Sequence, residues 1–478
     1  MDEKQLINGK IVNATPEEIQ KRRELLRAKK RRSHYIHVGL AVLAVVVVMG
    51  AVFGLYKWFS ADDGAVAARS TQQPTEDPRE AFRDEAIASA EQLAAGYDYE
   101  QAVAVLQQIE GYENDTKVSN LISQYQAQQD ALVEYPISEV THIFFHTLIN
   151  NCDKVFDGDY KQGDYNQVMT TVEEFNAIMQ SMYDRGYVLV ELSDMAGFET
   201  AEDGTQVWTE KKLLLPEGKK AFVLSQDDVS YYEYMEGDGY PSRLLIGEDG
   251  RITNEVINDD GTASYGSFDL VPLLEDFIAA HPDFSYKGAR GYLALTGYDG
   301  ILGYRTADKY KESLGEEEWQ RQVEECKQVV NRLLEQGWEF ASHSWGHLNL
   351  GQVSYSTFVS DSEKWEAQVR PLLENNGTYK VDTMIFAFGN DIGSWTPYTS
   401  QNERFLYLRD RGFHYFCNVD SSQTWVQNNS ELQYLRQGRR NLDGQRMWQD
   451  MTDDSVDYLS DLFDVNAVFD QRRPTPVE

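Results

Sequence analysis

Three groups of ionisable side chains in this sequence follow apolar stretches and could together bind a metal ion. Asp227 and Asp228 come directly after one such stretch, and His343 and His347, four residues apart, come after another. A further histidine, His146, ends a third stretch, in a chain with only eight histidines. One aspartate and two histidines form a ligand set that leaves metal positions open for water and substrate, as hydrolytic zinc sites require. The second aspartate could then deprotonate the water, and the separate histidine could protonate a leaving group.

Each of these groups also has a structural explanation when it is taken alone. Two adjacent aspartates in an acidic protein commonly form a solvated turn. Paired histidines are common at helix starts, and a histidine that ends an apolar strand is by default a neutral core residue. The occurrence of all three groups at predicted strand ends favours a shared metal site over these separate explanations.

Alternating strands and helices must position these groups. Beyond Pro136 the sequence switches repeatedly between short apolar runs and amphipathic helices, which predicts an α/β layer or barrel. Such folds place their ligand sites just past the carboxyl ends of the strands. We expect strands at residues 140–146, 187–192, 221–225, 338–342, 384–388 and 413–417, a helix opened by a capping box at 171–174, and a helix at 319–336.

The same residues resemble the motifs of the polysaccharide deacetylase family, carbohydrate esterase family 4. Residues 225–229 (Ser-Gln-Asp-Asp-Val) are similar to the family's Thr-Phe-Asp-Asp-Gly, and residues 343–347 match its His-Ser/Thr-x-x-His motif in full. Residues 386–390 resemble part of the third motif. Residues 145–147 (Phe-His-Thr) precede the aspartates, as the histidine strand does in the circularly permuted branch of the family.

Three departures from the family pattern accompany this resemblance, which extends from about residue 140 to the C-terminus. Val229 stands where the family has glycine, and the arginine of the third motif is absent. No histidine follows His414, so the family's late Leu-x-His motif is missing too. In the permuted branch of the family the equivalent histidine precedes the aspartate pair, and His146 occupies that position in this sequence.

The resemblance implies a distorted (β/α) barrel, a deacetylase-type catalytic domain at residues 136–478, with an insertion at about 230–267. It also implies an enzyme that removes N-acetyl groups from a polysaccharide, either an N-acetylglucosamine polymer or peptidoglycan. Two alternatives stay open. One is an O-acetyl esterase with the same site, and the other is a non-catalytic glycan-binding module, which the missing arginine suggests.

The resemblance also assigns roles within the site. Asp228, His343 and His347 would hold a divalent metal, with Zn²⁺ as the preferred ion. Asp227 would act as the catalytic base, and His146 would protonate the departing amine.

Five further residues are expected to contact the substrate. A backbone N–H near Phe388 and Gly389 would stabilise the oxyanion together with the metal. Tyr231 and Trp345 are candidate sugar-stacking residues, as is Tyr232, although each aromatic ring could equally fill the core.

The segment before the barrel predicts a single-pass membrane protein. Residues 1–37 are basic, and residues 38–59 begin with a charge-free apolar run long enough to span a bilayer. The basic residues place the N-terminus in the cytoplasm and the catalytic domain outside the cell, although a cleaved signal peptide is an alternative. Residues 60–79 are expected to form a linker, and residues 80–135 a small all-α spacer of tetratricopeptide type that could contact another protein.

Overall composition excludes one class of partner. The chain has 44 Lys and Arg against 78 Asp and Glu, a net charge of −34, so nucleic acid is not expected to bind. Its three cysteines are too few and too widely spaced for a disulfide framework or a thiolate zinc site.

Overall fold

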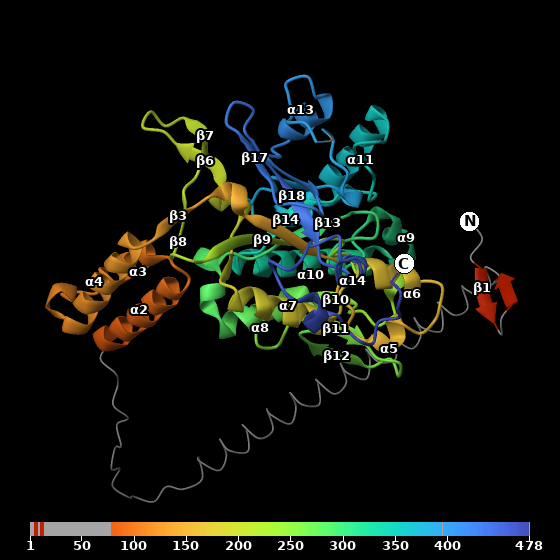
Figure 1. Cartoon of the computed structure of the whole chain (residues 1–478), viewed down its shortest axis with the longest axis horizontal. Coiled ribbons are helices and arrows are strands. Elements are labelled where there is room, and N and C mark those ends of the chain that lie inside the picture. Colours follow the sequence, from red (N-terminus) through yellow and green to blue (C-terminus); the bar gives the residue numbers. More distant parts are fainter. Residues whose placement is uncertain (1–3, 8–9, 14–77, 394, 478) are drawn as a thin grey trace, which may run out of the picture. The chain divides into compact units, whose positions relative to one another are not determined.

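The computed structural model describes residues 4–7, 10–13, 78–393 and 395–477 (Figure 1). Strands β1 (Lys4–Ile7) and β2 (Lys10–Asn13) form an antiparallel hairpin. Within the described ranges no helix is both long and apolar enough to cross a membrane. The anchor predicted at residues 38–59 lies outside the described residues, as does nearly all of the predicted linker, so both stay predictions.

Helices occupy the segment for which an all-α spacer was expected. They are α2 (Pro78–Ala95), α3 (Tyr99–Leu106) and α4 (Thr116–Asp130). Asp98 and Asp115 accept hydrogen bonds from the first backbone N–H groups of α3 and α4, which is the usual role of aspartate before a helix. Buried residues of these helices belong to the same apolar cluster as Val188 and Tyr292 of the neighbouring strands. The helices therefore pack directly against the barrel.

Seven parallel strands form a closed barrel. Their order is β13-β14-β15-β16-β18-β4-β9, and β9 pairs with β13 to complete the ring. This finding confirms the predicted (β/α) barrel. The strands are β4 (Thr141–Phe145), β9 (Lys220–Gln226), β13 (Tyr292–Leu295), β14 (Glu339–Ser342), β15 (Thr383–Ile385), β16 (Tyr415–Val419) and β18 (Tyr434–Asn441).

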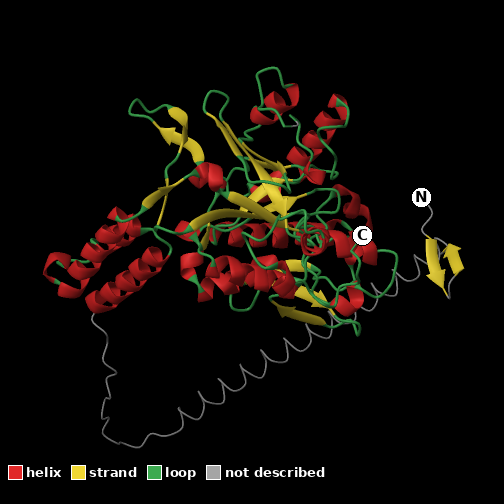
Figure 2. Cartoon of the chain, viewed as in Figure 1, coloured by secondary structure: helices red, strands yellow, loops and turns green. Residues whose placement is uncertain are grey.

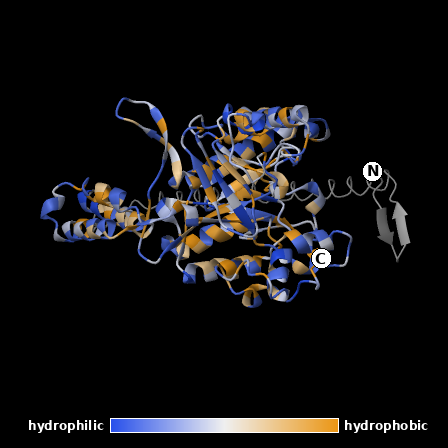
Figure 3. Cartoon of the chain, turned by 45° about the horizontal axis from the view of Figure 1, so that its top comes forward, coloured by the Kyte–Doolittle hydropathy of each residue, from blue (hydrophilic) through white to orange (hydrophobic). Residues whose placement is uncertain are grey.

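Helices surround these strands, as Figure 2 shows. Thr171 and Glu174 form the predicted capping box, each accepting a hydrogen bond from the other's backbone N–H at the start of α7. Figure 3 shows hydrophobic residues gathered along the central strands. The helices are α5 (Cys152–Val155), α6 (Gln162–Val168), α7 (Val172–Asp184), α8 (Leu270–Ala280), α9 (Lys311–Leu314), α10 (Glu316–Glu335), α11 (Tyr355–Gln368), α12 (Arg370–Leu373), α13 (Glu403–Arg409), α14 (Gly444–Thr452) and α15 (Val465–Val468).

Short strands complete this part of the chain. Two of them extend the barrel sheet, β5 (Tyr187–Leu189) beside β9 and β17 (Val426–Asn429) antiparallel to β18. The others are β3 (Val133–Tyr135) with β8 (Leu213–Leu215), β6 (Ala196–Thr200) with β7 (Gln206–Glu210), and β10 (Arg243–Ile246) with β11 (Ile252–Ile257), followed by β12 (Ala263–Gly266). Strands β10 to β12 fall within the stretch predicted to be an insertion.

Candidate active site

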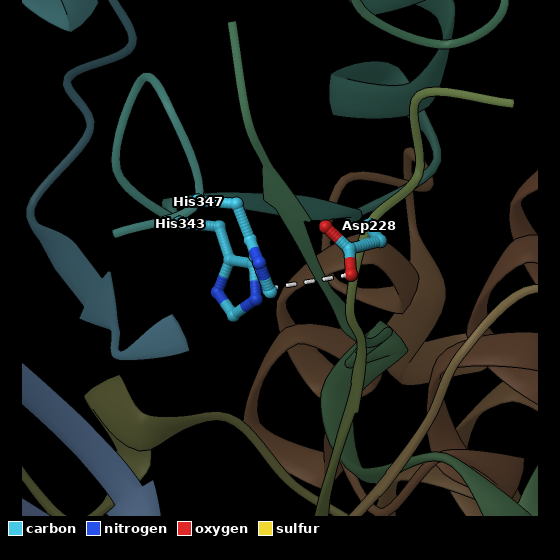
Figure 4. Close-up of side chains that lie close together, drawn as sticks. All are labelled: Asp228, His343 and His347. Carbon is cyan, nitrogen blue, oxygen red and sulfur yellow. Dashed lines mark ion pairs between the residues drawn. The ribbon is translucent and has the colours of Figure 1, made fainter. Parts of the chain in front are cut away.

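The three predicted metal ligands come together at the carboxyl ends of two barrel strands. Asp228 follows β9, and His343 and His347 follow β14. Strands β9 and β14 both pair with β13, one on each side of it. One candidate ligand atom from each side chain lies within 4.8 Å of the others. The Nε2 atom of His347 is 3.6 Å from the Oδ2 atom of Asp228, the pair marked by a dashed line in Figure 4. The parallel strand order thus brings together residues that lie over a hundred positions apart in the sequence, and they form one compact set of candidate metal ligands.

The ring of His343 is held in an orientation suited to a metal ligand. Its Nδ1 atom lies 2.8 Å from the backbone carbonyl oxygen of Ile385, so Nδ1–H donates and Nε2 keeps its lone pair. Burial lowers the pKa of His343, although the nearby carboxylates of Asp227 and Asp228 act in the opposite direction. A neutral imidazole is the form that binds metals. The donor chemistry therefore fits a divalent ion such as Zn²⁺.

Asp228 is fixed by its backbone and by a tyrosine. Its φ angle of 59° lies in the left-handed region, which aspartate adopts more readily than most side chains. The hydroxyl of Tyr232 donates to Oδ1 of Asp228 at 2.5 Å and lies 2.8 Å from Oγ1 of Thr296. Tyr232, offered as a sugar-stacking residue, is thus a buried residue that orients a candidate ligand.

Asp227 forms a buried ion pair that was not anticipated. The guanidinium of Arg439, on β18, donates to both of its carboxylate oxygens, at 2.7 and 2.9 Å. Both side chains are almost completely buried. Burial alone would raise the pKa of Asp227, but the charge and hydrogen bonds of Arg439, together with the electrostatic effects of His343 and His146, hold that pKa well below the usual range. Oδ2 of Asp227 lies 3.9 Å from Nε2 of His343, so an ionised carboxylate adjoins the ligand set.

His146 reaches the same rim, as the permuted topology requires. Strand β4 pairs with β9, and the backbone N–H of Asp227 donates to the carbonyl of Phe145 at 2.8 Å. The Nδ1 atom of His146 lies 3.1 Å from the carbonyl oxygen of Val168. His146 also acts electrostatically on Asp227 and on Asp443; burial raises the pKa of Asp443, and His146 acts in the opposite direction. Strand pairing thus brings His146 beside Asp227 despite the long stretch of sequence between them.

His142, on the same strand as His146, is a core residue instead. Its two ring nitrogens lie 3.2 Å from Oε1 of Gln437 and 2.9 Å from Oγ of Ser225. Burial and the charge of Arg439 lower its pKa well below the usual value. A fully buried, neutral and hydrogen-bonded ring is unsuited to transferring a proton to a substrate.

The turn after β15 presents one of the predicted substrate contacts to solvent. Phe388 is 64% exposed, and its ring centroid lies 4.5 Å from that of His347. The Gly389 N–H, however, donates to the carbonyl of Phe386 at 3.1 Å, so this group is already engaged and does not fit the expected oxyanion role. Gly389 has a φ of 65°, and a Cβ atom there would lie 2.4 Å from that of Val419, so its role is to allow this turn.

Tyr231 does not fit its predicted role in sugar binding. Its side chain is only 2% exposed, and its hydroxyl donates to Oδ2 of Asp269 at 2.7 Å, so a sugar ring cannot stack on it. A polar hydroxyl on an aromatic ring is compatible with the core when a partner such as Asp269 is available.

Trp345 is held by the helix α11. Its backbone N–H donates to Asp361 at 2.8 Å and its indole N–H donates to Gln368 at 3.1 Å. A Cβ atom on Gly297 would lie 2.4 Å from its ring. These contacts hold Trp345, within the histidine turn, against α11, and its predicted part in sugar binding stays a prediction.

The fold and the site together define a (β/α)-barrel protein with a candidate hydrolytic metal centre at the carboxyl rim of its strands. The sequence model of the family described as "Polysaccharide deacetylase" matches residues 317–407, which contain His343, His347 and Phe388. This match confirms the predicted resemblance to the polysaccharide deacetylase family over these residues. Asp227 and Asp228 lie before the matched segment. No curated protein sequence matches the chain.

Two solved structures are similar to this chain. The Streptococcus pyogenes deacetylase PplD in complex with acetate is 12% identical, with a TM-score of 0.34, over 66% of this chain and 99% of that chain. IcaB from Ammonifex degensii is 10% identical, with a TM-score of 0.31, over 65% of this chain and 94% of that chain.

Proposed function

We propose that this chain is a metal-dependent deacetylase that removes N-acetyl groups from a polysaccharide. The observation that carries the proposal is the meeting of three groups at one rim of the barrel. These groups are the ligand set Asp228, His343 and His347, the ion-paired carboxylate of Asp227, and the imidazole of His146. Amide hydrolysis needs a Lewis acid, a proton acceptor and a proton donor, and this rim offers a residue set for each.

Asp228, His343 and His347 would hold the divalent ion, for which Zn²⁺ is the preferred candidate. When bound, the ion would supply Lewis-acid chemistry that activates water and polarises the acetyl carbonyl. The chain's own contribution is to keep the ligands in place. Ile385 fixes the tautomer of His343, and Tyr232 fixes the carboxylate of Asp228.

Asp227 is proposed to accept the proton of the attacking water. Arg439 keeps this carboxylate ionised and oriented, at the expense of some basicity because its pKa is held low. His146 is proposed to donate a proton to the departing amine, since an amide anion is too poor a leaving group to depart without one. Asp443, which His146 influences electrostatically, is the nearby carboxylate that could orient its ring.

Two contacts with the acetyl group and its surroundings complete the proposal. The exposed ring of Phe388 borders His347 and would cover one side of the bound acetamido group. With the N–H of Gly389 engaged, the backbone of Phe388 is the part of the predicted oxyanion site that we retain.

The location of the reaction follows from sequence pattern alone. We propose that residues 38–59 anchor the chain in the cell membrane and that the barrel lies outside the cell, where a polysaccharide would be within reach. One face of α2, α3 and α4 packs against the barrel. The expected contact of these helices with another protein would therefore use their remaining surface, and it stays a prediction.

The proposal is tested by the bond that the purified protein breaks. We would incubate the zinc-loaded chain with an N-acetylglucosamine pentamer and with an O-acetylated oligosaccharide that has no amide. Free amine from the pentamer supports the deacetylase. Acetate from the second substrate alone supports the O-acetyl esterase. Binding of either glycan without any product would support the glycan-binding module.

A further inference from the structure

A hollow of about 460 Å³ adjoins the proposed active site and is not used by the mechanism. Val419, at the end of β16, lines this hollow and also packs against Gly389, next to Phe388. Arg446, on α14, lines it too, and the backbone N–H of Arg446 donates to Asp443 at 2.8 Å. Because Asp443 is within electrostatic reach of His146, the hollow lies on the side of the site where the proposed proton donor stands.

The walls of this hollow carry the side chains that sugar-binding sites use. Trp395 is 65% exposed, a high value for the largest apolar side chain. Aromatic rings of this kind offer a flat apolar face to the C–H groups of a sugar. The size of the hollow falls within the usual range for small-ligand sites, which are typically about 300–1,000 Å³.

Arg446 contributes hydrogen-bond donors that the protein leaves unused. Its guanidinium carbon lies 4.3 Å from the centroid of the Tyr458 ring, so the two side chains pack against each other. Over the residues that the structure describes, this guanidinium makes no hydrogen bond or ion pair with another side chain, and its Nε atom is buried without a partner. Because Arg446 lines the hollow, the terminal N–H groups of its guanidinium are the donors that a ligand oxygen could use.

Another part of the wall of the hollow is polar and is formed by residues 420–423, in the loop after β16. Asp420 accepts hydrogen bonds from Ser422, from Gln423 and from the indole of Trp425, which fixes the loop after β16. The hydroxyl and amide groups of this loop therefore stand in a defined position. A fixed polar loop, a free guanidinium and an exposed indole match the mixture of hydroxyls and C–H faces on a pyranose ring.

We propose that this hollow is a subsite for the sugar unit adjacent to the one that is deacetylated. The proposal rests on the proposed function, because the amine that His146 would protonate stays attached to the polymer, and the polymer must continue on that side. Trp395 stacks on the ring of this neighbouring sugar, and Arg446 donates to its oxygens. The protein thereby selects a chain of pyranose units over a single N-acetylated sugar.

The test compares Trp395→Ala and Arg446→Gln with the wild type, using the zinc-loaded full chain and an N-acetylglucosamine pentamer. We expect each change to raise KM about tenfold while kcat stays within twofold, since loss of one stacking or hydrogen-bonding contact removes binding shared by the ground and transition states. Tyr265→Ala, which removes another exposed aromatic side chain, should leave both constants unchanged. An unchanged KM in both variants, or a loss of kcat alone, would overturn the subsite.

A binding measurement separates failure of the subsite from failure of the proposed function. Calorimetric titration of the pentamer into the same proteins needs no turnover. A roughly tenfold weaker pentamer affinity in both variants supports the subsite even if the wild type releases no amine. Equal affinity in the wild type and the two variants overturns the subsite, whatever the activity.

Discussion

Replacing Arg439 with methionine is the most informative single change, because it leaves the proposed base in place and removes only its partner. In the wild type the guanidinium donates to both oxygens of Asp227 in a fully buried setting. Arg439→Met would keep much of the side-chain volume but leave a buried carboxylate uncompensated. Burial then becomes the dominant influence, and it raises the pKa of Asp227.

The size of the effect follows from the burial of the pair. Breaking a buried ion pair by removing one partner costs about 3–5 kcal/mol of unfolding free energy. The low pKa of Asp227 in the folded protein stabilises the fold above the unfolded pKa of aspartate, near 4, and that stabilisation is lost as the pH falls through the folded value. We therefore expect the full loss at pH 7. The double variant Asp227→Asn, Arg439→Met should recover most of it, since neither charge is then buried.

The assays are urea denaturation and the pH profile of kcat/KM. The acid limb of the profile should move to higher pH by at least about one unit in Arg439→Met, because Asp227 must lose its proton before it can accept one. Arg436→Met is the matched control. Arg436 lies on the same strand in a comparably buried pair with Asp391, so its loss should destabilise the fold without moving the acid limb. An unmoved acid limb in Arg439→Met, or an equal shift in both variants, would refute the assigned role.

Three further changes test other parts of the account. Asp227→Asn should retain zinc but lose turnover about 10²–10⁴-fold, the usual contribution of a general base, and loss of zinc would mean that its role and that of the neighbouring aspartate are exchanged. His146→Ala should lower turnover at saturating metal by about 10²-fold or more, whereas normal activity would leave the proton donor unidentified. Burial and the charge of Glu191 raise the pKa of Glu339 to about 8. The ionisation of Glu339 therefore opposes folding as the pH rises from the unfolded pKa of glutamate, near 4.5, through about 8. Glu339→Gln should raise the unfolding free energy at pH 9, by at most about 5 kcal/mol, and leave it unchanged at pH 4.

The ligand set could be predicted from the sequence because its signals are local. His343 and His347 follow an apolar strand at a fixed spacing, and the aspartate pair follows another, so parallel pairing was enough to bring them together. The position of His146 was also predictable, once the absence of any histidine after His414 left the permuted order as the way to supply a proton donor.

Arg439 could not be found in the same way, because its strand does not have the sequence of a buried strand. Residues 434–441 read Tyr-Leu-Arg-Gln-Gly-Arg-Arg-Asn, a polar run that predicts a loop. The barrel nevertheless buries nearly all of β18, since Arg436 pairs with Asp391 and Arg439 pairs with Asp227. A strand whose charges are neutralised by distant residues carries no apolar periodicity. The only local signal was a cluster of arginines in an otherwise acidic chain.

Tyr231 shows the opposite limit. An aromatic residue three positions after a candidate ligand is equally consistent with substrate contact and with the core, and only the position of Asp269 decides for the core. The packing of α2, α3 and α4 against the barrel was hidden for a similar reason, because their helical periodicity defines an apolar face without identifying what covers it.

The central claim is that Asp228, His343 and His347 hold a metal ion that the reaction requires. The most direct test measures amine release from the N-acetylglucosamine pentamer by the full chain after chelation, and again after Zn²⁺ is restored. We expect chelation to abolish release in the wild type and Zn²⁺ to restore it, while His343→Ala stays inactive in both conditions. Amine release that survives chelation, or that Zn²⁺ restores equally in His343→Ala, would contradict the claim.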